Sequence, residues 1–121
     1  MSKVLLIEDE KIFIELFGDR LRLAGFEVSA AENGAWGLKE ATKEKFDLFI
    51  IDMMMPAMTG EEVIAKLKMD DKTKNVPIIV LSASVDEEAQ KRVEKMGVHL
   101  FLLKTRITPS DLAKKALDLL K

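Results

Sequence analysis

The sequence has no cysteine among its 121 residues, which excludes disulfides and thiolate metal sites, and nothing in it points to export. It also lacks long apolar runs, since stretches such as Leu48 to Ile51 are far too short to span a bilayer. The first residues, MSKVLLIEDE, have neither the apolar stretch nor the cleavage site of a signal peptide. We therefore expect a cytoplasmic protein without membrane contact.

Neither sign of charge dominates, because 19 Lys and Arg stand against 21 Asp and Glu, giving a net charge of -2. This balance gives no electrostatic reason to expect direct nucleic-acid binding. What the sequence does contain is 48% hydrophobic and 33% charged residues, as is typical of a folded globular protein. The length fits about one domain, and we expect residues 1–121 to form it without linkers or repeats.

Short apolar stretches alternate with helical patterns along the whole chain. Strands are predicted at residues 3–8, 26–31, 48–52, 78–83 and 98–104. A helix is expected after each strand, and the predicted helix starts are Asn33, Thr59 with Glu62, Ser84 with Glu87, and the stretch 108–111. Gly25 and Gly97 are predicted to end the first and fourth helices. This order predicts an α/β fold, namely a doubly wound five-stranded parallel sheet with helices on both faces.

Polar side chains stand at four of the five predicted strand ends. Glu8 and Asp9 end the first strand, Asp52 the third, Ser82 the fourth and Lys104 the fifth. Each alone has an ordinary interpretation as a helix cap, a turn residue or a surface residue. A doubly wound sheet, however, places its site at the carboxyl ends of its strands, so we expect these side chains to converge.

The expected cluster has a definite chemistry. Three neighbouring acids repel one another unless a cation is present, and oxygen ligands beside a phosphate suit Mg²⁺. Lys104 is predicted to pair with a phosphate, and Ser82 to donate its hydroxyl to one. Asp52, on the central strand, is the best placed nucleophile.

Five motifs carry a resemblance that covers the whole chain: LLIEDE, AENGAWGL, DMMMPAMTG, VLSAS and FLLK. Together they resemble the receiver domains of bacterial two-component response regulators, of the single-domain chemotaxis type. The resemblance implies a flavodoxin-like sheet of strand order 2-1-3-4-5. It also implies a signalling protein that catalyses only its own phosphorylation and dephosphorylation, and is otherwise no enzyme.

The resemblance further implies partners and residue roles. A histidine kinase or phosphotransfer protein would pass a phosphoryl group to Asp52, and a downstream protein or fused effector domain would respond. Ser82 would move toward that group and Phe101 would turn inward, switching a surface made by the fourth helix, fifth strand and fifth helix. The implied Mg²⁺ ligands are Glu8 through water, Asp9, Asp52 and the backbone carbonyl of Met54, with Pro56 and Gly60 shaping the loop between.

Some residues depart from the family pattern or stand outside it. Thr105 replaces the proline that usually follows the lysine, so we expect a trans bond between Lys104 and Thr105. Trp36 is interpreted as a packing or half-exposed residue. Methionines 53 and 55 are expected in the core, and 54 and 58 at the rim of the site.

Three other classes of protein share parts of this pattern. A haloacid-dehalogenase-type phosphatase would need a second Asp two residues after the nucleophile, where this chain has Met54. A flavodoxin would hold phosphate in the loop after the first strand, where the acidic EDEK would repel it. The remaining alternative is a degenerate receiver, which keeps the fold as a phosphorylation-independent interaction module.

Overall fold

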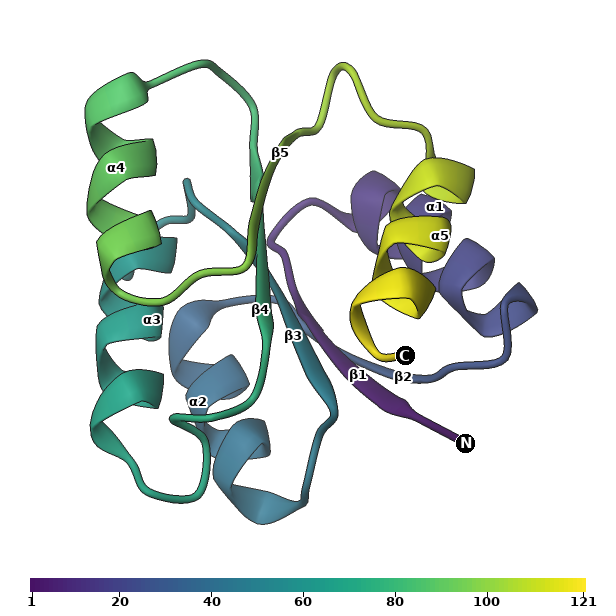
Figure 1. Ribbon diagram of the computed structural model, residues 1–121, viewed down its shortest axis with the longest axis horizontal. Helices are drawn as coiled ribbons and strands as arrows, with labels where there is room; N and C mark the ends of the chain where they lie inside the picture. Colours follow the sequence, from purple (N-terminus) through teal and green to yellow (C-terminus); the bar gives the residue numbers. More distant parts are fainter.

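The computed structural model describes residues 1–121 and shows a five-stranded parallel sheet between two layers of helices (Figure 1). The strand order is β2-β1-β3-β4-β5, as the resemblance implied. The elements are β1 (Lys3–Ile7), α1 (Lys11–Leu23), β2 (Glu27–Ala31), α2 (Gly34–Lys43), β3 (Leu48–Asp52), α3 (Gly60–Met69), β4 (Ile78–Ser82), α4 (Glu87–Lys95), β5 (Leu100–Leu103) and α5 (Pro109–Leu119). None of the helices is long and apolar enough to cross a membrane.

The sheet is covered on both faces because its central strands β1, β3 and β4 are apolar except at single end positions, namely Lys3, Asp52 and Ser82. Successive strand residues point to opposite faces, so Leu48 and Ile50 of β3 pack with α1 and α5, while Phe49 and Ile51 pack with α2, α3 and α4. Figure 1 shows this division, with α2, α3 and α4 on one side of the sheet and α1 and α5 on the other. The continuous hydrophobic pattern of β1, β3 and β4 therefore follows from burial on both sides.

The carboxyl ends of β1 and β3 meet at the point where the strand order reverses. Ile7 is paired with Ile51, so the acids that follow Ile7 lie beside Asp52 at the end of β3. Crevices at such reversal points are where doubly wound sheets bind ligands. The topology alone thus places the predicted residues of β1 and β3 in one neighbourhood.

The predicted helix starts are confirmed except at α4. The side chains of Asn33, Thr59 and Thr108 each accept a backbone N–H of the helix that they begin, and Thr108 forms a reciprocal capping box. The capping box predicted from Ser84 to Glu87 is wrong. Asp86 caps α4 instead, accepting the N–H of Ala89, while the Ser84 N–H lies against the Ser82 hydroxyl.

Two expectations about the backbone are confirmed. Gly25 and Gly97 follow α1 and α4 with φ of 100° and 95°, a conformation that glycine adopts without steric cost. No peptide bond is cis, so the bond between Lys104 and Thr105 is trans, as expected.

Candidate functional site

Glu8 and Asp52 are buried carboxylates that each receive only one backbone hydrogen bond. Glu8 has no exposed surface, and its Oε2 accepts the N–H of Glu10 at 3.0 Å. Asp52 is 2% exposed, and its Oδ1 accepts the N–H of Met54 at 3.3 Å. Asp9 Oδ1 and Asp52 Oδ2 are buried oxygens without a hydrogen-bond partner, whereas Glu8 Oε1 lies against the ammonium of Lys104. Buried acceptors without a partner are unusual in proteins and are typical of a site that binds a cation or ligand.

Lys104 is the cation that the structure places among these acids. Its Nζ lies 2.6 Å from Glu8 Oε1 and 3.4 Å from Asp52 Oδ2, and 3.8 Å from the exposed Glu10. The lysine follows β5 directly, and its backbone N–H is bonded to the carbonyl of Ser82, so both strand ends are locked in register. One ammonium thus faces more than one acid, and the buried cluster keeps a net negative charge.

The electrostatic environment of Asp52 disfavours its charge. Burial raises the pKa of Asp52 to about 7, repulsion from Glu8 adds to this, and Lys104 and the Met54 N–H only partly oppose it. Burial also works against the charge of Lys104, but the hydrogen bond that its ammonium donates to Glu8 and the attraction of Asp52 outweigh it, so the pKa of Lys104 is raised. The site is therefore poised to accept additional positive charge.

Ser82 is buried at the end of β4, and its hydroxyl faces its own loop. The hydroxyl donates to the carbonyl of Ser84 at 2.7 Å, and the Ser84 N–H lies 3.4 Å from the same oxygen. To bond a group attached to Asp52, the Ser82 hydroxyl would have to give up its contact with Ser84. The loop between β4 and α4 would change with it.

The loop after Asp52 is held in a tight reversal. The N–H of Gly60 donates to the carbonyl of Met53 at 3.0 Å, and Ala57 has a φ of 68°, unusual for a residue with a side chain. A Cβ at Gly60 would stand 2.8 Å from Met53 Cα and would overlap the carbonyl oxygen of Asp52. Gly60 thus permits the close approach that shapes the loop, whereas the strain at Ala57 was not foreseen.

Trp36 and three of the four methionines lie as the sequence indicated, whereas Met58, expected at the rim of the site, packs against the core. Met53 and Met55 are each 7% exposed and belong to the core on the α2, α3 and α4 side. Met54 is 68% exposed beside the acids, and Met58 is partly buried against the core. Trp36 is half exposed, with its indole N–H directed to a glutamate one turn further along α2.

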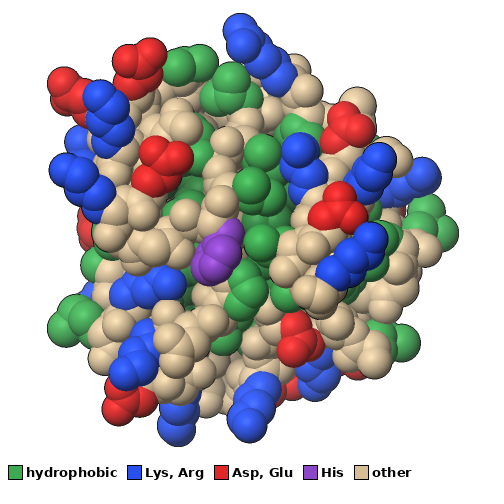
Figure 2. Space-filling view, viewed as in Figure 1, with side chains coloured by type: hydrophobic (Ala, Val, Ile, Leu, Met, Phe, Trp, Pro, Cys, Tyr) green, Lys and Arg blue, Asp and Glu red, His purple; other side chains and the backbone are tan.

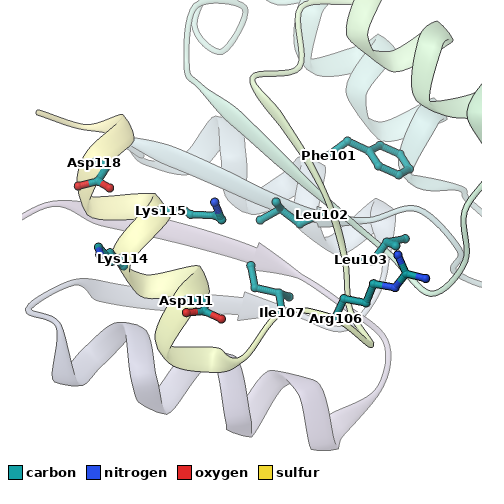
Figure 3. A pocket seen from close by; sticks show the side chains of 9 residues that line it. All are labelled: Phe101, Leu102, Leu103, Arg106, Ile107, Asp111, Lys114, Lys115 and Asp118. Atoms are coloured by element: carbon teal, nitrogen blue, oxygen red, sulfur yellow. The ribbon is translucent and has the colours of Figure 1, made fainter.

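Phe101 lies on β5, between α4 and α5. It is partly buried against the core on the α4 side, whereas its neighbour Leu102 packs toward α5 (Figure 3). Both border a hollow of about 620 Å³ that Arg106, Lys114 and Lys115 also line. Figure 2, which views the molecule as Figure 1 does, shows hydrophobic side chains in the centre of this face and charged ones toward its margins.

Two residues at the site were missed by the sequence interpretation. Glu10 brings a carboxylate oxygen into a group with Glu8 and Asp9 whose atoms lie within 4.8 Å of one another. Phe13 places its ring under Lys104, with 4.4 Å between Nζ and the ring centroid. Both stand within five residues of Glu8 at the start of α1, so their proximity to the strand end was the available signal.

The donor atoms present fit a hard divalent cation. Carboxylate oxygens without partners are the ligands that Mg²⁺ prefers, and no sulfur or imidazole is among them. The acidic group that the structure brings together is Glu8, Asp9 and Glu10, with Asp52 beside it.

The fold and the site place the chain in the class of flavodoxin-like α/β proteins that carry an acidic cluster where the strand order reverses. The family model described as "Response regulator receiver domain" matches residues 4–117, so the chain belongs to that family. It is a receiver domain of two-component phosphorelay signalling.

Individual relatives agree. Over 108 residues the chain is 28% identical to the polar-differentiation response regulator DivK of Brucella anthropi, covering 89% of this chain and 88% of DivK. The structure of chemotaxis protein CheY4 from Vibrio cholerae is 31% identical, with a TM-score of 0.91 and 98% of each chain covered. The response regulator TrrA from Thermotoga maritima, in complex with Mg(2+)-BeF, is 28% identical with a TM-score of 0.84 and full coverage of both chains.

Proposed function

We propose that this receiver accepts a phosphoryl group on Asp52 from a histidine kinase or phosphotransfer protein. The observation that carries the proposal is the free oxygen of Asp52. Oδ2 is buried, has no hydrogen-bond partner, and lies 3.4 Å from the ammonium of Lys104. A carboxylate with an unpaired oxygen beside a fixed cation is arranged to form a new bond to an electrophile of high negative charge.

The transfer itself needs little from the protein beyond position and charge. Oδ2 of ionised Asp52 attacks phosphorus, and the bond from phosphorus to the donor breaks, leaving its electron pair with the donor. Lys104 stabilises the negative charge on the phosphoryl oxygens. In this role the protein promotes its own phosphorylation and dephosphorylation and turns over no separate substrate.

Mg²⁺ is the proposed cofactor, with Glu8, Asp9, Asp52 and the carbonyl of Met54 as its proposed ligands. When bound, the ion neutralises charge on the transferring group. Support comes from the unpartnered oxygens described above and from the related TrrA, whose structure contains Mg(2+)-BeF. The raised pKa of Asp52 also agrees, because a divalent cation favours the ionised carboxylate that the isolated cluster disfavours.

The proposed output is a shift between two conformations. A phosphoryl group on Asp52 would draw the Ser82 hydroxyl away from Ser84, and Phe101 would move into the space that this loop leaves. The changed surface of α4, β5 and α5 would bind a downstream protein or a fused effector domain.

We further propose that residues 1–121 act as one receiver unit, that it works in the cytoplasm, and that it contacts neither nucleic acid nor membrane.

Treatment with acetyl phosphate tests the proposal. Intact mass spectrometry should show one added phosphoryl group on the wild type when Mg²⁺ is present, and none when EDTA replaces it. Asp52→Asn should remain unmodified under both conditions. An unmodified wild type, where a control receiver is labelled in parallel, would favour the degenerate receiver that binds partners without phosphorylation.

A further inference from the structure

The ammonium of Lys104 lies over an aromatic ring as well as between acids. Its Nζ is 4.4 Å from the centroid of Phe13, within the range of a cation–π contact. Phe13 in turn stacks on Phe17, with 5.6 Å between the ring centroids and 17° between the planes. Phe17 is 2% exposed in the core between the sheet and the helices α1 and α5. The ring under Lys104 is therefore held by the core itself.

This arrangement restrains a side chain that is otherwise flexible. A lysine has four rotatable bonds and a strongly hydrated head group, so its ammonium stays in one place only if several contacts hold it there. Glu8 and Asp52 attract it through charge, and the ring supplies the third contact. An aromatic face also keeps water from the ammonium, which strengthens the attraction to both carboxylates.

Glu10 is an exposed acid that competes with the ring for the ammonium of Lys104. Its carboxylate is 3.8 Å from Lys104 Nζ, and its side chain is 57% exposed. An ammonium released from the ring would become hydrated and free to follow this exposed acid toward solvent. It would then lie farther from the oxygen of Asp52 on which a phosphoryl group would be formed.

We propose that Phe13 is a positioning residue for phosphoryl transfer, and that its ring holds the Lys104 ammonium beside Asp52. This inference rests on the proposed role of Asp52 as the phosphoryl acceptor. It assigns a function to a residue whose ring acts on the reaction only through the ammonium of Lys104. The role depends on the aromatic face, so a tyrosine should replace Phe13 and an aliphatic side chain should not.

The first experiment observes the geometry without any transfer. Protons above an aromatic face are shifted upfield, so the ε-methylene protons of Lys104 should be shifted in the metal-free wild type. The signal is identified in protein labelled with ¹³C-lysine by its loss from Lys104→Met. Phe13→Tyr should keep the shift and Phe13→Leu should abolish it. An unshifted wild-type signal, or an unchanged one in Phe13→Leu, would overturn the inference.

The second experiment measures phosphorylation by acetyl phosphate with saturating Mg²⁺. Loss of a cation–π contact predicts about a fivefold lower maximal rate for Phe13→Leu and an unchanged rate for Phe13→Tyr. Phe46→Leu is the matched control, because Phe46 is 6% exposed in the core on the opposite face of the sheet. Its rate should equal that of the wild type.

The outcomes separate the two proposals. If the wild type is phosphorylated at Asp52 but Phe13→Leu reacts as fast, or Phe13→Tyr is as slow as Phe13→Leu, the role of Phe13 is refuted and that of Asp52 stands. If the wild type takes up no phosphoryl group, or Asp52→Asn still does, the acceptor proposal itself fails. Circular dichroism confirms folding, and Phe13→Met replaces Phe13→Leu in both experiments if the latter does not fold.

Discussion

The ammonium of Lys104 lies closer to Glu8 than to Asp52, at 2.6 Å against 3.4 Å. Glu8 is fully buried, so this is an interior ion pair and not a surface contact. The attraction of Lys104 does not compensate for the burial of Asp52, so the pKa of Asp52 rises to about 7. The pair therefore sets both the stability of the site and its affinity for added positive charge.

Lys104→Met tests how much this ion pair stabilises the fold. The substitution keeps an unbranched side chain but leaves Glu8 and Asp52 buried without a counter-charge, so the free energy of unfolding should fall by about 3 kcal/mol at pH 8. The loss should be smaller at pH 5, where Asp52, with its pKa raised to about 7, carries a proton. Urea denaturation at the two pH values, without divalent ions, measures both effects.

Lys3→Met is the control for that experiment. Lys3 also contacts two acids, Glu27 and Glu44, but at the surface. Removing such exposed pairs changes the free energy of unfolding by less than about 1 kcal/mol. Equal losses in the two variants would contradict an interior ion pair at Lys104.

Asp52→Asn should stabilise the metal-free protein, and more so at higher pH. The pKa of Asp52 is raised from 3.8 to about 7 in the folded state, so the folded protein holds a proton that the unfolded chain releases. The stabilisation that comes from this bound proton is fully present below pH 4 and is lost as the pH rises to 7. The asparagine has no charge to lose, so its advantage over wild type should grow by up to about 4 kcal/mol across this range.

The measurement compares urea unfolding of wild type and Asp52→Asn at pH 4.5 and pH 8. Millimolar Mg²⁺ at pH 8 should shrink the difference, because the ion stabilises the ionised carboxylate. A difference that does not vary with pH would show that burial does not disfavour the charge of Asp52.

Ser82→Ala should separate phosphorylation from the response to it. The hydroxyl's bond to the Ser84 carbonyl is lost, which should lower the free energy of unfolding by about 1 kcal/mol. Asp52 keeps its own contacts, so acetyl phosphate should still modify the protein. The amide shifts of residues 83–90 on phosphorylation should be smaller than in wild type when followed by NMR. Ser84→Ala, which retains the backbone carbonyl, should keep them, and full-size shifts in Ser82→Ala would exclude the proposed movement.

Gly60→Ala should disturb the loop after Asp52. The added Cβ would overlap the backbone of Asp52 and Met53, so the loop must shift, at a cost of about 2 kcal/mol or more. Gly18→Ala provides a contrast, since its Cβ would meet only the side chain of Arg22, at 3.3 Å, within helix α1. Alanine there should stabilise the helix by about 0.5–1 kcal/mol. Thermal unfolding would contradict this account if both variants changed stability in the same direction.

The sequence predicted the fold because its signals agreed at every level. Continuous apolar strands, glycines at helix ends and threonine caps each had a local physical cause that the structure retains. The boundaries of the strands were predicted less accurately than their existence. The fifth strand begins at Leu100 and not at Val98, because its pairing with β4 starts there. The cap of α4 is Asp86 and not Ser84, because the helix begins at Glu87 and the side chain of the residue before it accepts the N–H of Ala89.

Contacts between distant residues limited what could be foreseen at the site. The convergence of Glu8, Asp52 and Lys104 followed from topology, since parallel strands end at one edge. The preference of Lys104 for Glu8 depends on side-chain reach and burial, which spacing does not encode. The ring of Phe13 under Lys104 joins residues 91 positions apart and resembles ordinary core packing in the sequence.

The position of the phosphoryl group is the most direct test of the central claim. Borohydride reduces an aspartyl phosphate to homoserine, so treatment after reaction with acetyl phosphate and Mg²⁺ marks the acceptor in the chain. Peptide mass spectrometry should then find homoserine at position 52 and nowhere else. Homoserine at position 9 instead, or no reduced residue in protein that has gained a phosphoryl group, would contradict the assignment of Asp52.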